Sequence, residues 1–172
     1  MNVTVAALAL IVAVAFVSMP LVRHRYGAAA MAKAQRELSR QGVRTTALTE
    51  HGMRFDASGH ESAAPIGIAT VLMVIAGVNL AEPGWAGAVS VVVFALVLLG
   101  NSVIVYSNLT AVKSVRAAFA RKKDPDLLRL DVPALLAAAE SGFLAWTWTL
   151  QKLRNGAVFG AATLGIAITV LG

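Results

Sequence analysis

Three histidines are the side chains of this sequence best suited to bind a metal or to transfer a proton. His24, His51 and His60 lie in one polar segment, together with the carboxylates of Glu50, Asp56 and Glu61. A metal site needs ligands that converge from fixed elements, whereas these residues are irregularly spaced in a segment of loop-like composition. We therefore expect solvated or capping roles for them, and no metal site.

The remaining sequence has no group that suggests catalysis. Glu140 is the lone acid of its segment, with no second titratable group at helical spacing to share acid–base work. Cysteine is absent, which excludes disulfides and thiolate chemistry. Phosphate-binding loops, nucleophile elbows and zinc-protease motifs are also missing. The sequence predicts a protein that is not an enzyme and has no catalytic residue, cofactor site or metal site.

Four long apolar runs dominate the chain, at about residues 3–22, 63–81, 85–106 and 156–172. A helix of about 20 apolar residues crosses the hydrocarbon core of a bilayer, and the three residues Glu82–Gly84 leave room only for a tight turn. Hydrophobic residues make up 58% of the chain and charged residues 14%, far from the composition of soluble domains. We predict an all-α membrane protein with four transmembrane helices, in which residues 1–172 form a single polytopic domain.

The first apolar run could instead be a cleaved signal peptide. A signal peptide has a basic stretch before its apolar core and a small-residue cleavage site after it. Here no basic residue precedes the run, and Arg23, His24 and Arg25 follow it directly. These flanks favour a retained first helix.

The basic residues predict the orientation in the membrane. Of the fifteen Lys and Arg residues, seven lie in residues 23–62 and eight in residues 107–155. Cytoplasmic loops carry such an excess, so both segments are predicted to be cytoplasmic and both termini outside. The expected interface anchors are the aromatic residues near the span ends: Trp85, Tyr26, Tyr106, Trp146 and Trp148.

Both polar segments have recognisable local patterns. Apolar residues recur at three and four positions over residues 26–41, which predicts a helix that ends at Gly42. Thr, Val and Phe around Gly52 suggest a small cytoplasmic β-hairpin over about residues 43–57. Residues 133–155 have an apolar stripe that includes Trp146, Leu150 and Leu153, typical of an amphipathic helix at the membrane surface. The sequence leaves two alternatives for the last span: it continues this helix, or it is a separate helix.

Small and polar residues within the spans suggest packing contacts. Gly156 and Gly160 form a GxxxG pattern that Ala161 and Gly165 extend, as in helices that approach closely. Asn79 and Asn101 are the most polar side chains of the spans, and we expect them to bond to neighbouring helices. The predicted spans contain no charged residue or histidine, which argues against a proton-coupled transporter.

The Ala-, Val- and Arg-rich, Lys-poor composition and the four-span plan resemble the small accessory subunits of the actinobacterial cytochrome bc–oxidase respiratory supercomplex. The resemblance implies a non-catalytic accessory or scaffolding subunit in a bacterial plasma membrane. Its expected partners are other integral membrane subunits and anionic lipid at the cytoplasmic face. Nucleic acid is not expected, because the basic residues lack interleaved aromatic residues.

Two alternatives remain open from the sequence. One is a small transporter or channel component with a path lined by Asn79, Asn101, Thr70, Ser90 and Ser102. The other is a membrane enzyme that acts on lipid at the cytoplasmic face through His51, His60 and Glu61.

Overall fold

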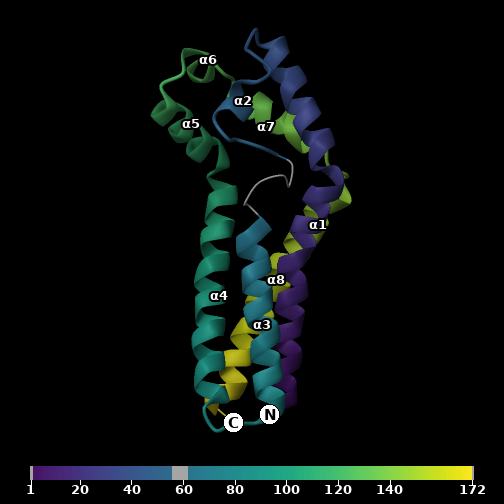
Figure 1. Cartoon of the computed structure of the whole chain (residues 1–172), viewed down its shortest axis with the longest axis vertical. Helices are drawn as coiled ribbons and strands as arrows, with labels where there is room; N and C mark the ends of the chain where they lie inside the picture. Colours follow the sequence, from purple (N-terminus) through teal and green to yellow (C-terminus); the bar gives the residue numbers. More distant parts are fainter. Residues whose placement is uncertain (1, 56–61, 172) are drawn as a thin grey trace. The chain divides into compact units, whose positions relative to one another are not determined.

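The computed structural model describes residues 2–55 and 62–171 (Figure 1). The chain is 84% helical, with no strand among the described residues. The helices are α1 (Asn2–Arg40), α2 (Ala47–Glu50), α3 (Ala63–Ala81), α4 (Ala86–Leu109), α5 (Ala111–Lys122), α6 (Pro125–Leu128), α7 (Val132–Glu140) and α8 (Trp146–Leu171). Among these, α1, α3, α4 and α8 are long and apolar enough to cross a membrane. The prediction of an all-helical chain with four such helices is confirmed, and it is compatible with a multi-pass membrane protein.

The chain divides into two compact units. Unit 1 comprises Met1–Pro20, Glu61–Val105 and Trp148–Gly172, and unit 2 comprises Leu21–His60 and Tyr106–Thr147. Unit 1 therefore contains the apolar runs, whereas unit 2 is assembled from the two polar segments, which lie far apart in the sequence.

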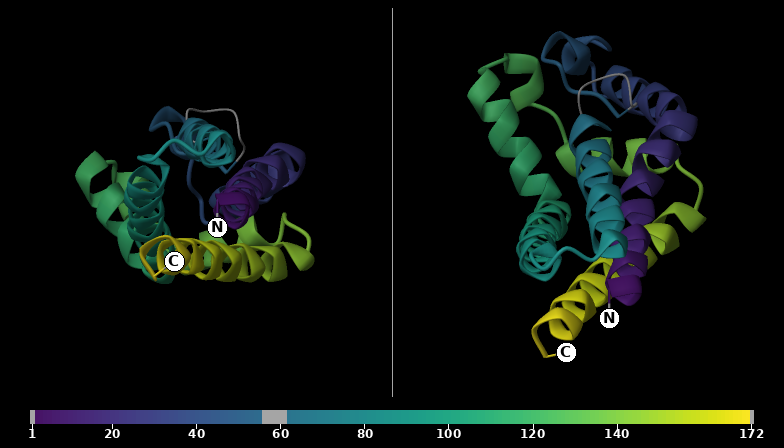
Figure 2. Two further views of the ribbon diagram at one scale, coloured as in Figure 1. Left: turned by 90° about the horizontal axis from the view of Figure 1, so that it is seen from below. Right: turned by 60° about the horizontal axis from the view of Figure 1, so that its bottom comes forward.

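Unit 1 is a bundle of α3, α4, the first half of α1 and most of α8 (Figures 1 and 2). The start of α1, the end of α8 and the α3–α4 connection lie at the same end of the bundle (Figure 1). The predicted tight turn is present there: Glu82 adopts a left-handed conformation, and the amide of Ala86 donates to the carbonyl of Pro83 at 2.9 Å. Phe16, Leu72, Phe94 and Val158 are among the buried residues of its core.

Unit 2 has a separate apolar core. Its buried residues come from both polar segments, among them Leu38 and Leu48 from the first and Phe119, Leu127 and Leu135 from the second. Asp124 and Asp131 begin α6 and α7 as N-caps, and their carboxylates accept from the amides of Asp126 and Ala134. Each is followed within two residues by proline, which is favoured in the first helical turn.

The predicted β-hairpin is wrong over its described part, residues 43–55, where the chain forms α2 and turns; residues 56 and 57 lie outside the described residues. Gly42 and Gly52, with φ of 70° and 69°, end α1 and α2. After each glycine the next amide returns to the helix: Val43 donates to Leu38, and Met53 to Leu48. This pattern is the Schellman cap. A glycine with positive φ can end a helix as well as form a hairpin turn. The prediction of a turn at Gly52 was therefore correct, but the turn ends a helix and does not join two strands.

The predicted amphipathic helix over residues 133–155 is also wrong as one element. It is interrupted between Glu140 and Trp146, and residues 146–155 are the first turns of α8. The chain passes α1 closely at this break: a Cβ added to Gly142 would lie 2.3 Å from the Cα of Ala30. The sequence did not reveal this break, because the apolar residues after Gly142 keep the helical spacing of those before it.

Two helices extend beyond the spans that the sequence predicted within them. α1 runs without interruption from Asn2 to Arg40, past Pro20, so the first span and the following polar helix are one element. α8 begins at Trp146, ten residues before the predicted start of the last span. The fourth apolar helix therefore includes Lys152 and Arg154, which precede the uncharged residues 156–172 of the predicted span.

Candidate functional site: an apolar groove beside buried polar side chains

Unit 1 contains an open groove between α3 and α4. Its volume is about 470 Å³ and its surface is almost entirely apolar. Its lining consists of Phe16, Ala64, Gly67, Ile68, Val71, Val93, Leu96, Val97 and Gly100. A Cβ added to Gly67 or Gly100 would meet no atom within 4 Å, so these glycines widen the groove without serving a close helix contact. The volume is in the range of small-molecule sites.

A buried cation of unit 1, Arg154, contacts Phe16 but is not itself among the residues that line the groove. The guanidinium carbon of Arg154 is 5.1 Å from the centre of the Phe16 ring, and Phe16 lines the groove. Arg154 is only 7% exposed. One of its terminal nitrogens donates to Asn155, whereas its Nε has no partner, and no carboxylate among the described residues pairs with it. Such a cation is costly in an apolar region unless an anion or aromatic face balances it.

The two span asparagines differ sharply in their surroundings. Asn79 is buried, and its amide donates to Ser90 Oγ of α4 at 2.7 Å and to the carbonyl of Ile75 at 2.8 Å. Asn101 is fully buried, yet neither atom of its amide has a hydrogen-bond partner among the described residues. It lies one helical turn beyond Val97, on the buried face of α4, and is not among the residues that line the groove. Asn79 thus links α3 to α4 by a hydrogen bond, whereas the amide of Asn101 forms no hydrogen bond within the described part of the chain.

This difference predicts opposite effects of the same substitution. Asn79→Leu should lower the free energy of unfolding by about 1–2 kcal/mol, because Ser90 loses its partner across the helix interface. Asn101→Leu should leave stability unchanged or raise it in lipid-free detergent, because it removes a buried amide without partners. Thermal unfolding of both purified variants checks the pair. Equal destabilisation would contradict the contrast.

The small residues of α8 lie in two kinds of surroundings. Gly165 contacts α4, where an added Cβ would lie 2.5 Å from the Phe94 ring, and Ala161 is buried in the core of unit 1. Gly156 and Gly160 have nothing within 4 Å of an added Cβ. The C-terminal half of the small-residue pattern therefore packs inside the chain, and the GxxxG pair does not.

The predicted interface anchors are largely exposed. Trp85, Tyr106, Trp146 and Trp148 all have at least two fifths of their surface accessible. Trp146 also packs edge-on against Tyr26, with ring centres 6.1 Å apart.

The five residues of the proposed transport path do not lie together on one surface. Asn79, Ser90 and Asn101 are buried. Thr70 and Ser102 are exposed, and each hydroxyl donates to a carbonyl of its own helix, Ile66 and Leu98 respectively.

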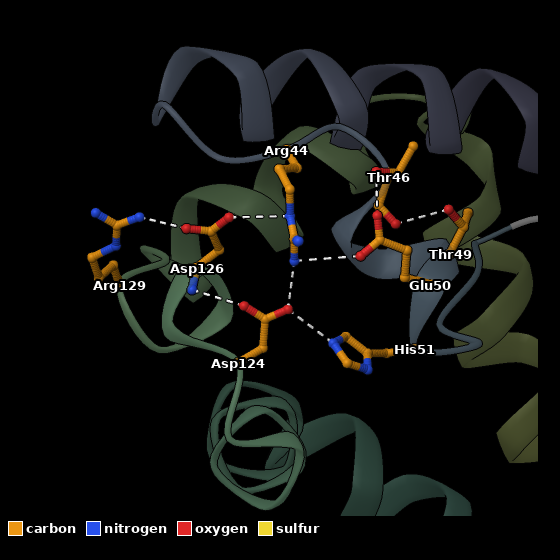
Figure 3. Close-up of polar contacts among 8 residues, drawn as sticks. All are labelled: Arg44, Thr46, Thr49, Glu50, His51, Asp124, Asp126 and Arg129. Atoms are coloured by element: carbon orange, nitrogen blue, oxygen red, sulfur yellow. Dashed lines mark hydrogen bonds and ion pairs between the residues drawn. The ribbon is translucent and has the colours of Figure 1, made fainter.

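Unit 2 contains a polar cluster centred on Arg44 (Figure 3). Its guanidinium lies 2.6 Å from Asp124 Oδ2, 3.2 Å from Asp126 Oδ2 and 3.3 Å from Glu50 Oε2. His51 Nε2 is 3.0 Å from the same oxygen of Asp124. The cluster joins the turn around α2 to the start of α6, and we assign it a structural role. Among the described residues, no group of histidines and carboxylates could hold a metal; His60, Asp56 and Glu61 lie outside them.

The cluster perturbs the ionisation of Asp124. The hydrogen bond from His51 contributes most to lowering the pKa of this carboxyl, followed by the amide of Asp126 and the charge of Arg44. At the end of α1, hydrogen bonds from Arg40 and Gln41 lower the pKa of Glu37 to about 2. Both carboxylates stabilise the fold at pH values above the ordinary carboxyl pKa, and this contribution is lost as the pH falls through their lowered values.

We therefore expect unit 2 to lose stability in acid, from about pH 4.5 down to about pH 2. Asp124→Asn should lower the melting temperature at pH 7 while reducing its dependence on acid pH, because asparagine can still cap α6 but cannot pair with Arg44. Glu140→Gln changes an exposed carboxyl and is the control. Melting curves across this range give the comparison, and identical profiles for Asp124→Asn and wild type would contradict the assigned role.

Sequence reasoning missed Arg154 and the groove. The predicted stripe placed Leu153 on the buried face, but Leu153 is exposed, and the buried face of α8 contains Thr147, Arg154 and Val158. A signal was present: Arg154 precedes Val158 by one turn and Ala161 and Ala162 by two, on one helix face. The Arg44 cluster joins residues 80 positions apart, which no local pattern indicates.

Comparison of the chain with protein-family models, with curated proteins and with solved structures found no match.

Proposed function

We propose that this chain is a non-catalytic accessory or scaffolding subunit of a larger complex in a bacterial plasma membrane. The observation that carries the proposal is an exposed apolar seam on α4. It consists of Val89, Val92, Leu96, Leu99, Val103 and Tyr106, which alternate at spacings of three and four residues. This is the repeat by which left-handed helix pairs interlock, in membranes as in water. Of the four apolar helices, α4 is the least covered by its own chain.

The orientation of the chain in the membrane is part of this proposal. Residues from both polar segments form one core in unit 2, which supports their position on the same side. The fifteen Lys and Arg residues, all within these segments, support a cytoplasmic location, with both termini outside. A respiratory supercomplex of the kind that the composition resembles is one assembly that would fit.

Purification of the tagged full chain in mild detergent tests the role. We expect a membrane subunit to co-purify in fixed stoichiometry and to be lost when Leu99→Ala and Val103→Ala are combined. The matched control combines Leu80→Ala and Val74→Ala on α3, which are 58% and 59% exposed against 66% and 67% for Leu99 and Val103, and it should retain the partner. Recovery of the wild-type chain as a monodisperse monomer would contradict the proposal, as would equal loss of the partner in both double variants.

A further inference from the structure

The densest group of positive charges in the chain lies on α5 and at its C-terminal end. We define the cationic surface as the five exposed Lys and Arg residues of this stretch: Lys113, Arg116, Arg121, Lys122 and Lys123. Together they are five of the fifteen Lys and Arg residues of the chain. The sequence has no acidic residue between Glu82 and Asp124, so no carboxylate of α5 itself offsets these charges.

The packing of α5 fixes the direction of this surface within unit 2. Phe119 is 2% exposed and belongs to the core of unit 2, against which Val112 and Val115 also pack. These three residues recur at spacings of three and four and therefore share one face of the helix. Lys113 and Arg116 lie on the other side and are exposed. The apolar face of α5 is therefore occupied by its own unit, and the cations are available to a partner.

The carboxylates closest in sequence to the cationic surface already have partners. Asp124 and Asp126 both pair with Arg44, and Asp126 also pairs with Arg129 (Figure 3). None of the five cations forms an ion pair or a side-chain hydrogen bond within the part of the chain that the structure describes. Like charges in one group repel each other, and a facing set of anions relieves this repulsion. The cationic surface thus fits an anionic partner.

The position of α5 in the chain indicates which anionic partner this is. Helix α4 ends at Leu109, which is 81% exposed. Lys113 follows four residues later, a distance of at most about 14 Å even for an extended chain. Electrostatic attraction at physiological salt extends about 8 Å, and the headgroup layer adds about 5–8 Å beyond the hydrocarbon. With α4 in the membrane, the first cations are therefore within reach of lipid headgroups.

The aromatic residues of α5 argue against nucleic acid as the partner. Surfaces that bind single strands combine cations with exposed aromatic rings on which bases stack. Phe119 is the one aromatic residue of α5, and it is buried in the core of unit 2. The cationic surface offers charge alone, which suits a layer of phosphate groups.

We propose that the cationic surface of α5 binds the anionic phospholipid headgroups of the leaflet next to unit 2. Basic residues directly beyond a membrane span are attracted to anionic lipid, each by about fivefold in affinity. The inference rests on the membrane placement given under the proposed function but not on the accessory role. A chain that purifies as a monomer would lose that role and retain this surface.

Lipid nanodiscs that contain the full chain test the proposal. One set has phosphatidylcholine alone and the other has equal parts of phosphatidylcholine and phosphatidylglycerol. A fluorophore on Ala117→Cys, an exposed position among the cations, should be quenched less by the neutral quencher acrylamide when phosphatidylglycerol is present. About 1 M salt should restore quenching, because the Debye length falls to about 3 Å. The same fluorophore on Ser39→Cys, exposed on α1, should be quenched equally in both lipids. Equal quenching of the Ala117→Cys label in both lipids, or protection that salt does not reverse, would overturn the proposal.

Matched charge variants locate the surface. In the labelled Ala117→Cys chain, Lys113→Gln with Arg116→Gln should weaken the apparent affinity for phosphatidylglycerol at least about tenfold. Arg25→Gln with Arg36→Gln removes the same charge from exposed positions on α1 and should leave the affinity unchanged. Equal loss in both pairs would show that net charge and not this surface is responsible. Protection by an added DNA duplex in phosphatidylcholine alone, as strong as that by phosphatidylglycerol, would assign the surface to nucleic acid and contradict the proposal.

Discussion

Leu127→Ala is expected to lower the free energy of unfolding by about 2–5 kcal/mol, as is typical of leucine-to-alanine changes in packed cores. Leu127 on α6 is 1% exposed and belongs to the core that joins the two polar segments. Its loss leaves a cavity in a core that also contains residues of the first segment, so the variant tests whether these segments pack together. Thermal or denaturant unfolding of the purified chain gives the value.

The neighbouring residue provides the control. Leu128 lies on the same helix but is 58% exposed, so Leu128→Ala should change stability by no more than about 0.5 kcal/mol. Both substitutions remove the same atoms from the same helix and differ only in burial. Similar effects of the two would show that α6 is not packed as described.

Gly142→Ala should destabilise the chain by about 3 kcal/mol, near the upper end of overpacking costs. The added Cβ would lie 2.3 Å from the Cα and 2.5 Å from the amide nitrogen of Ala30. Because both atoms belong to the backbone of α1, no side-chain rotation relieves the contact, and the 141–145 connection must move. Trp146, which packs on Tyr26 four residues further along, should report this movement in tryptophan fluorescence.

Gly156→Ala is the matched comparison for this second prediction. Gly156 lies within α8 and has nothing within 4 Å of an added Cβ. Alanine there should be neutral or stabilise the helix by up to about 1 kcal/mol, since glycine is the poorer helix former. A chain that tolerates alanine equally at both positions would contradict the close passage of Gly142 along α1.

The long apolar helices were predictable because their signal is local and strong. α3 coincides with the predicted span 63–81, since Ser62 and Glu82 mark abrupt changes in polarity at its two ends. The prediction failed where the same residue type is found in two kinds of structure. A glycine can end a helix or form a hairpin turn, and Gly52 ends a helix. It also failed at Gly142, whose role depends on the approach of Ala30 from a distant part of the chain.

The candidate site could be predicted only in part. Asn79 and Asn101 were identified from their polarity. The sequence does not reveal that Asn79 bonds to Ser90, whereas the amide of Asn101 has no hydrogen-bond partner among the described residues. The groove depends on how α3 and α4 pack around Phe16, which hydropathy does not encode. The burial of Arg154 was not predicted, because the predicted start of the last span lies after it. Arg154 was therefore grouped with the basic residues of the second polar segment.

Cysteine accessibility tests the central claim most directly, namely that four helices cross the membrane with both polar segments on one side. The chain has no cysteine of its own, so Thr45→Cys, Lys122→Cys and Gly84→Cys, all at exposed positions, each create a single label site. In intact cells, a membrane-impermeant maleimide should label Gly84→Cys alone, and the other two only after permeabilisation. Labelling of Thr45→Cys and Lys122→Cys from opposite compartments would contradict the account.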